Sequence, residues 1–233
     1  MTTIRIMSAG AVHSMLTALG AEFERESGHR LDFMFNTAGA LREQFVDGDI
    51  SDVLVLPESV IEALDAQGHF VGGSRTQLAS TVTGVVVRKG ASQPDISTPD
   101  AFKRALLSAK SVSYTDPKAG GSSGKFFAGL LEQLGIADEV DRKAVLGKRG
   151  TDVAQIVADG RAELGTTFVS EVLPIAGTQV VGPLPGQLHN TNAYTAAIPA
   201  KASAPDAAAA FLRKLTDPAA RQRWVEAGLE PSF

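Results

Sequence analysis

The sequence predicts an α/β protein with two lobes, each holding a mostly parallel sheet flanked by helices. Strands alternate with helices along most of the chain, and this series occurs twice, separated by a Gly-, Ser- and Thr-rich stretch at residues 72–83. Such alternation is typical of parallel sheets with helices on both faces. The length of 233 residues and the 44% hydrophobic content suit one large or two small globular domains.

The first series begins with a strand at residues 3–8 and an amphipathic helix at 11–28. This helix places Leu16, Leu19 and Phe23 on one side and ends at Gly28, a residue that commonly terminates helices. The elements that follow are a strand and turn at 30–39, a helix at 40–49, a strand at 51–56 and a helix at 57–68. Pro57 near the start of the last helix and Gly68 after it fit the usual asymmetry of helix ends.

The second series opens with "GVVVRKG", a continuous apolar strand at 84–90. We expect the following order: helix 98–110, strand 111–116, a glycine-rich loop with its helix at 116–135, helix 151–160, strand 162–169, helix 170–174, strands 178–185 and 192–200, and helices 205–215 and 218–228. No repeat at a solenoid period and no low-complexity linker interrupts it.

Composition excludes several classes of function. The net charge is −4 and no long basic run is present, so a nucleic-acid partner is not expected. The chain contains no cysteine, which excludes disulfides, thiolate metal sites and thiol nucleophiles. Four histidines show no helical pair at the spacing of a zinc site, and no serine lies in a G-x-S-x-G elbow. We therefore expect neither a metal nor a cofactor, and no hydrolase.

The turns after the strands point to an anion. "DPKAGGSSG" at 116–124 opens a helix, and helix N-termini present free N–H groups and a partial positive charge. It is not a nucleotide-binding P-loop, because Phe126 follows the Gly-Lys pair. The turns at 8–14, 36–40 and 148–152 have a similar character, and ligands of open α/β sheets bind at the carboxyl ends of strands. A well-capped helix with no ligand is the alternative interpretation of any single turn.

The chain resembles the type II periplasmic solute-binding proteins, and among them the molybdate-binding branch. The resemblance covers nearly the whole chain and rests on "SAGAVHSMLTALGAEFERESG", "FNTAGALREQFVDGDISDVLVLPES", "DPKAGGSSGKFFAGLLEQLGI", "VADGRAELGTTFVSEVL" and "VVGPLPGQLHNTNAYTAAI". It implies one lobe from residues 1–80 plus 196–233 and another from 81–195, joined by crossover strands near 84–88 and 193–198. Binding in the cleft between the lobes, with closure by a hinge motion, is the function that it implies.

The resemblance also implies ligand-binding positions, and here the sequence departs from the molybdate binders. Hydroxyl side chains and loop N–H groups hold the oxyanion in that branch, and the corresponding positions are Ala11, Ala38, Ser123, Gly150 and Phe168. Three hydroxyl donors are missing, and each hydrogen bond to a charged ligand is worth about 1.5–3 kcal/mol. Molybdate and tungstate are therefore not the expected ligands.

The polar side chains of the turns suit a small organic anion, in particular a carboxylate. Asn36, Thr37, Ser122 and Ser123 offer hydrogen bonds, and Arg149 offers the planar fork that matches a carboxylate. An exposed Arg149 and serines that only cap the helix are the alternatives.

Catalysis by proton transfer is the alternative function. Some relatives of these binding proteins are enzymes, such as aconitate isomerase, which shifts a proton and a double bond within a tricarboxylate. His13 or His189 could be the base of a cofactor-free isomerase of a small di- or tricarboxylate. The competing interpretation makes each histidine an ordinary polar residue.

Partners and location follow from the same reasoning. A binding protein would be a monomer that delivers a small anionic ligand to the membrane component of an ABC transporter. The first residues lack a basic segment followed by an apolar one, so the chain as written is expected in the cytoplasm, or in the periplasm if a leader has been removed.

Overall fold

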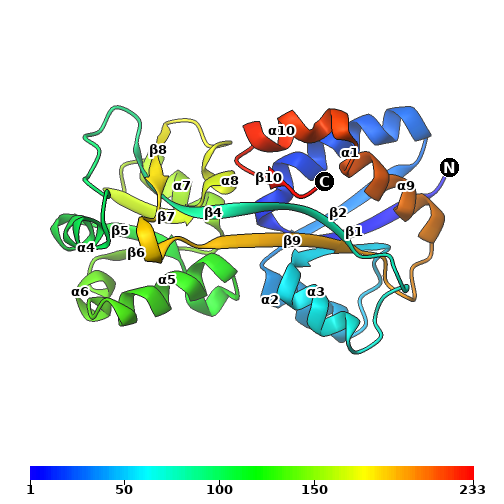
Figure 1. The fold of residues 1–233 in the computed structure, drawn as a ribbon, viewed down its shortest axis with the longest axis horizontal. Coiled ribbons are helices and arrows are strands. Elements are labelled where there is room, and N and C mark those ends of the chain that lie inside the picture. The colour runs from blue at the N-terminus through cyan, green and yellow to red at the C-terminus, as the bar shows by residue number, and fades with distance from the viewer. The chain divides into compact units, whose positions relative to one another are not determined.

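The structure, a computed structural model, describes all residues from 1 to 233 and divides them into two compact units. The first unit comprises residues 1–80 and 192–233, and the second comprises residues 81–191. The chain leaves the first unit within β4 (Thr76–Arg88), a long strand in Figure 1, and its return lies at the start of β9 (Thr191–Ala197). Sequence analysis placed the return at residue 196.

The first unit contains a sheet in the order β2-β1-β3-β9. The strands β1 (Thr3–Ala9), β2 (Arg30–Asn36) and β3 (Val53–Pro57) are parallel, whereas β9 runs antiparallel to β3. A short strand, β10 (Glu230–Pro231), pairs with the first part of β4. The predicted parallel arrangement therefore holds for the three strands that helices connect.

Helices cover both faces of this sheet, as Figure 1 shows. On one side lie α1 (His13–Ser27), α9 (Pro205–Leu215) and α10 (Arg221–Glu226), and on the other lie α2 (Ala38–Val46) and α3 (Glu58–Asp65). The rings of Phe23 and Phe211 join α1 to α9 at a centroid distance of 5.3 Å. Leu41 of α2 and Ile61 of α3 are fully buried, so each helix buries an apolar stripe against the strands.

The second unit contains a sheet in the order β4-β7-β5-β6. The strands β5 (Val112–Thr115), β6 (Ala144–Gly147) and β7 (Leu164–Phe168) are parallel, and β4 runs antiparallel to β7. β8 (Thr178–Pro183) also pairs antiparallel with β4. The carboxyl ends of the three parallel strands lie at the same edge of the sheet.

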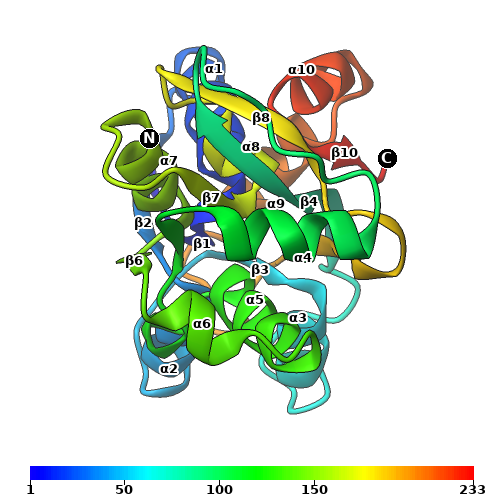
Figure 2. The ribbon, with the colours of Figure 1, turned by 90° about the vertical axis from the view of Figure 1, so that its left-hand side faces the viewer.

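Two apolar clusters hold the helices of this unit on opposite faces. Val85 of β4 packs in one cluster with α4 (Pro99–Ser108), α5 (Ser122–Gln133) and α6 (Ala137–Asp141). Val86, whose side chain points to the other face, packs with α7 (Gly150–Ala158) and α8 (Val169–Val172). Figures 1 and 2 show α5 and α6 on one side of the sheet and α7 and α8 on the other.

Short 3₁₀ turns complete the chain: η1 (Gly10–Val12), η2 (Pro117–Ala119), η3 (Gly186–Leu188) and η4 (Pro218–Ala220). None of the helices is long and apolar enough to cross a membrane.

Several sequence expectations were wrong in detail. Residues 76–83, expected in a loop, form the first part of β4, because pairing with β10 and β7 overrides their small polar composition. The strand β6 and the helix α6 were not predicted, because each is too short to show a period. The helix expected at 40–49 begins at Ala38, directly after the capping residue Thr37.

A buried carboxylate, Asp52, ties together three segments of the first unit. It is 0% exposed and accepts hydrogen bonds from the N–H groups of Arg5, Ser203 and Ala204 at 2.7–2.9 Å and from the Ser203 hydroxyl at 2.9 Å. Burial raises the pKa of Asp52, but the four hydrogen bonds together lower it by more than burial raises it. The pKa of Asp52 therefore lies below its usual value. The charged form thus stabilises the junction of β1, β3 and the start of α9.

Replacing this carboxylate should destabilise the first unit. We expect Asp52→Ala to lower the free energy of unfolding by about 3 kcal/mol at pH 7, because several buried N–H groups lose their acceptor. Because the native pKa is lowered, the difference from wild type should shrink as the pH falls below 3.8. Urea unfolding at several pH values measures it, with the exposed Asp49→Ala as control. Equal losses in the two variants would contradict the assignment.

Candidate functional site: loops at the carboxyl ends of the strands

Two turns of the first unit lie side by side at the end of its sheet. β1 and β2 are neighbours, with Ala9 opposite Asn36, so the turns that follow them start from the same edge. Ala11 in η1 and Ala38 at the start of α2 are both buried and contribute no side-chain donor. Thr37 caps α2 by accepting a hydrogen bond from Ala40 N–H at 3.4 Å.

His13 is the first residue of α1 and lies against the end of β2. Its ring is exposed, and its centroid lies 4.2 Å from that of Phe35. The side chain of Asn36 accepts a hydrogen bond from Thr37 N–H at 2.8 Å. The first unit therefore brings His13, Asn36, Thr37, Ala11 and Ala38 together, as the order of its turns requires.

In the second unit, the turn before α5 lies beside the turn before α7. Thr115 at the end of β5 pairs with Gly147 at the end of β6, and Asp116 N–H donates to the Gly147 carbonyl at 2.8 Å. A Cβ atom on Gly124 would lie 2.3 Å from the Thr115 carbonyl oxygen. The first turn of α5 is thus pressed against the end of β5, and only glycine fits there.

The N-terminus of α5 carries no side-chain cap. Gly121 occupies the N-cap position and has no side chain, so the N–H groups of the first turn have neither a helical carbonyl nor a capping acceptor. Ser123 is buried, and its hydroxyl bonds to the Thr115 hydroxyl at 3.3 Å. The alternative in which the serines only cap this helix is therefore not what the structure shows, because neither hydroxyl caps it.

Arg149 has a partner that the sequence analysis did not consider. It is the N-cap residue of α7, and its guanidinium donates to the Asp152 carboxylate at 3.2 Å, while Asp152 also accepts from Arg149 N–H at 3.0 Å. The Arg149 side chain is 60% exposed. A ligand carboxylate that used this guanidinium would share it with Asp152.

A further acidic group, Glu171, lies beneath the N-terminus of α7. It is 7% exposed and accepts hydrogen bonds from the Thr167 hydroxyl at 3.1 Å and from Gly150 N–H. The pKa of Glu171 is raised to about 7, mainly because the carboxyl group is buried. The two hydrogen bonds and the charge of Arg149 lower this pKa, whereas the charge of Asp152 raises it. The sequence did not point to Glu171, because its position after Ser170 in the short helix α8 gives no sign that the side chain is buried.

The remaining predicted residues are less well placed. Phe168 ends β7 with a buried ring and offers no side-chain donor. His189 is exposed, with Nε2 3.3 Å from the Thr191 hydroxyl, and belongs to the second unit, whereas His13 belongs to the first. Nowhere does the structure bring together three side chains suited to hold a metal ion.

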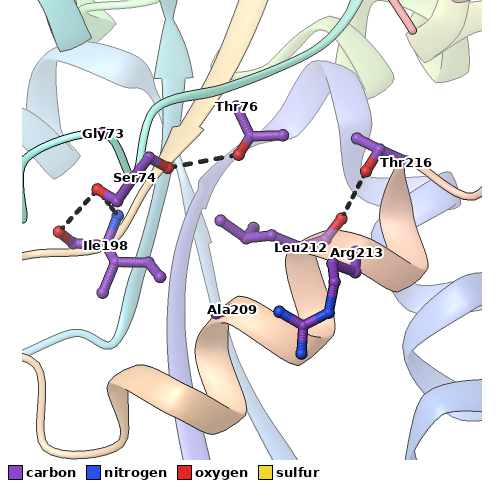
Figure 3. A pocket seen from close by; sticks show the side chains of 8 residues that line it. All are labelled: Gly73, Ser74, Thr76, Ile198, Ala209, Leu212, Arg213 and Thr216. Atoms are coloured by element: carbon purple, nitrogen blue, oxygen red, sulfur yellow. Dashed lines mark hydrogen bonds between the residues drawn. The ribbon is translucent and has the colours of Figure 1, made fainter.

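Figure 3 shows a pocket elsewhere in the first unit, with a volume of about 210 Å³. The hydroxyl groups in its lining already have partners: Ser74 bonds to the backbone of Ile198, Thr76 donates to the Ser74 carbonyl, and Thr216 donates to the Leu212 carbonyl. Arg213, Gly73 and Ala209 complete the lining. None of the predicted site residues lies in it.

The sequence of this chain identifies its family. Residues 4–230 match the model of the bacterial extracellular solute-binding proteins. The chain belongs to this family. The solute-binding protein has the type II fold that the sequence resemblance implied. A periplasmic molybdate-binding protein from Azotobacter vinelandii superposes with a TM-score of 0.77, at 20% identity, over 97% of this chain and 98% of that one.

Two curated relatives of this solute-binding protein differ in their described roles. Aconitate isomerase from a Pseudomonas species is 29% identical over 99% of this chain and 88% of its own length. The molybdate-binding protein ModA of Azotobacter vinelandii is 27% identical over 72% of this chain and 66% of its own length. The family likeness therefore supports a solute-binding role of the ModA-like kind and leaves the ligand open.

Contact between Gly150 and Glu171 can be tested by adding one methyl group. A Cβ atom at Gly150 would lie 1.8 Å from Glu171 Oε2 and 2.4 Å from Thr167 Oγ1. We expect Gly150→Ala to lower the free energy of unfolding by about 3 kcal/mol, because these groups must move. In contrast, Gly129→Ala in α5, where a Cβ meets no atom within 4 Å, should raise stability by up to about 1 kcal/mol. Urea unfolding compares the two, and a neutral Gly150→Ala would refute the close contact.

Proposed function

We propose that this solute-binding protein captures a small organic anion, a carboxylate, at the loops that follow its parallel strands. The uncapped N-terminus of α5 is the observation that carries the proposal. Its first-turn N–H groups point out of the carboxyl end of β5, where the partial positive charge of a twelve-residue helix favours an anion. Arg149 begins the neighbouring helix α7 and adds a cation.

A carboxylate suits these loops better than a tetrahedral metal oxide. The positions at which the molybdate-binding branch is expected to supply hydroxyls hold Ala11, Ala38 and Phe168, and the side chains of all three are apolar and buried. A guanidinium instead matches the two oxygens of a carboxylate. The similarity to ModA makes molybdate the ligand against which the proposal must be tested.

Transport is the role that such binding serves in this family. The proposed partner is the membrane component of an ABC transporter, which would receive the ligand from this protein. That role requires the protein to meet its solute outside the cytoplasmic membrane, in the periplasm.

An isomerase of a small di- or tricarboxylate is the second candidate function. The similarity to aconitate isomerase, which spans 99% of this chain, favours it. His13 is an exposed imidazole at the carboxyl ends of β1 and β2, so it could take a proton from a bound substrate. His189 is the other candidate base, and its ring nitrogen contacts only Thr191 in a hydrogen bond.

A ligand screen separates these functions. We expect small carboxylates to raise the melting temperature and molybdate to leave it unchanged. Each stabilising compound is then incubated with the protein in heavy water and followed by proton NMR. Intact ligand supports a binding protein, whereas exchanged or rearranged protons support the isomerase. Stabilisation by molybdate alone would contradict the carboxylate proposal.

Removing one N–H group tests the α5 site. Ser122 is the first residue of α5 and follows Gly121, whose backbone is extended (φ −72°, ψ 139°), so Ser122→Pro fits the helix while deleting a donor. We expect it to weaken binding of the best carboxylate by about tenfold to a hundredfold. The matched control, Ser122→Ala, keeps the N–H and removes only the hydroxyl, so it should bind more tightly than Ser122→Pro. Calorimetry measures both, and equal affinities would remove α5 from the site.

Removing the guanidinium tests the contribution of α7. Arg149→Ala should weaken carboxylate binding by about 1.5–3 kcal/mol if the contact is charge-assisted. Arg161→Ala, three residues after the C-terminus of the same helix, is the control for net charge. Should the two variants bind alike, Arg149 serves only its ion pair with Asp152.

A further inference from the structure

The buried carboxyl group of Glu171 lies at the N-terminus of α7, where its charge acts on the first N–H groups of this helix. Only two acidic side chains are buried in the protein, Asp52 and Glu171. Asp52 accepts four hydrogen bonds at a structural junction, whereas Glu171 accepts from Gly150 N–H and the Thr167 hydroxyl alone. A buried carboxylate with two donors is less well compensated than one with four.

The position of this carboxyl group is set by the backbone. Glu171 Oε2 lies only 1.8 Å from the position that a Cβ atom of residue 150 would take, so the carboxyl group contacts the first residue of α7 from inside the protein. Gly150 is also a predicted ligand position. An anion bound outside this helix terminus would therefore share its N–H groups and positive charge with Glu171.

Few other charges act on Glu171. Arg149 and Asp152 face it from the start of α7 and are paired with each other at 3.2 Å. The strands beside α8, β7 and β8, have no charged residue, and β4 contributes Thr81, whose hydroxyl accepts from Ser170 N–H. The protonation of Glu171 thus decides the net charge beneath this helix terminus.

We propose that Glu171 is a specificity-determining residue, whose proton sets how much negative charge the α7 terminus accepts from a bound anion. The inference rests on the proposed function, because it needs a ligand at these loops. When Glu171 is protonated it is neutral, and the N-terminus of α7 favours a dianion. When Glu171 is ionised, its carboxylate and the bound anion repel each other from opposite sides of Gly150. The raised pKa of Glu171, about 7, places this change in the neutral range. Binding of a dianion is then accompanied by proton uptake, which grows as the pH rises above 7 and does not exceed one proton.

The test compares Glu171→Gln, which keeps the shape and removes the charge, with Glu139→Gln on the exposed surface of α6. The probes are succinate, a dianion, and acetate, a monoanion, and calorimetry gives Kd at pH 5.5, 7.0 and 8.5. At a given pH the ligand has the same charge in the wild-type and the variant experiments. The ratio of the wild-type Kd to the variant Kd therefore reports the effect of Glu171 alone. For succinate we expect a ratio near one at pH 5.5 and about ten at pH 8.5, and for acetate a smaller rise. Glu139→Gln should follow the wild type throughout.

Two results would overturn the proposal, and they are distinguishable. Binding of succinate with a ratio that does not change with pH removes Glu171 from specificity and leaves the proposed function intact. Failure of both probes and of every other carboxylate in the screen to bind either protein at any pH overturns the proposed function and this inference with it.

Two further measurements keep the proposal testable if Glu171→Gln folds poorly. Because the native pKa is raised from 4.5 to about 7, the wild type should lose thermal stability relative to Glu171→Gln as the pH rises from about 4.5 to about 7, with no ligand present. A constant difference in melting temperature would refute titration of Glu171. Thr167→Val removes one donor to the carboxylate and should move the midpoint of the pH-dependent succinate affinity upward. An unmoved midpoint would also count against Glu171.

Discussion

Close approach between helix N-termini and strand ends is the constraint on which the second unit depends. The first turns of α5 and α7 touch the strands so tightly that side chains at Gly124 and Gly150 would collide with neighbouring oxygen atoms. Burying backbone N–H groups at such a junction is unfavourable unless each finds an acceptor. If a side chain of the protein accepts hydrogen bonds from the first-turn N–H groups, the helix terminus has only a structural role. If no side chain does so, these N–H groups remain available to a ligand.

The helix termini near the strand ends solve this problem in different ways. Thr37 caps α2 with its own hydroxyl, as is common for threonine at that position. At the start of α7, the Asp152 carboxylate accepts from Arg149 N–H and the Glu171 carboxylate accepts from Gly150 N–H. α5 begins after a glycine and without a side-chain acceptor, and α1 and α3 also begin without one. We therefore select α5 by its glycine N-cap together with the neighbouring cation of Arg149.

Much of the fold was predictable because parallel strands and long helices leave a clear period in the sequence. The turns at the strand ends were predictable for the same reason, since order along the chain places them at one edge of each sheet. The first half of β4 was not, because tertiary pairing rather than its Ser- and Thr-rich composition makes it a strand. Arg149 was recognised as a cation, but its pairing with Asp152 depends on side-chain geometry, and Glu171 became visible only through its burial.

Asp52 also has a consequence for how the chain reaches its folded state. It joins the start of β3 to Ser203 and Ala204, 151 and 152 residues later in the chain. The second unit is one continuous segment, so it can complete its contacts while the C-terminal segment is still being synthesised. The first unit must wait for residues 192–233, and its long-range contacts make it the slower unit to form. Until Ser203 and Ala204 have been synthesised, Asp52 lacks three of the four hydrogen bonds that it accepts in the folded protein.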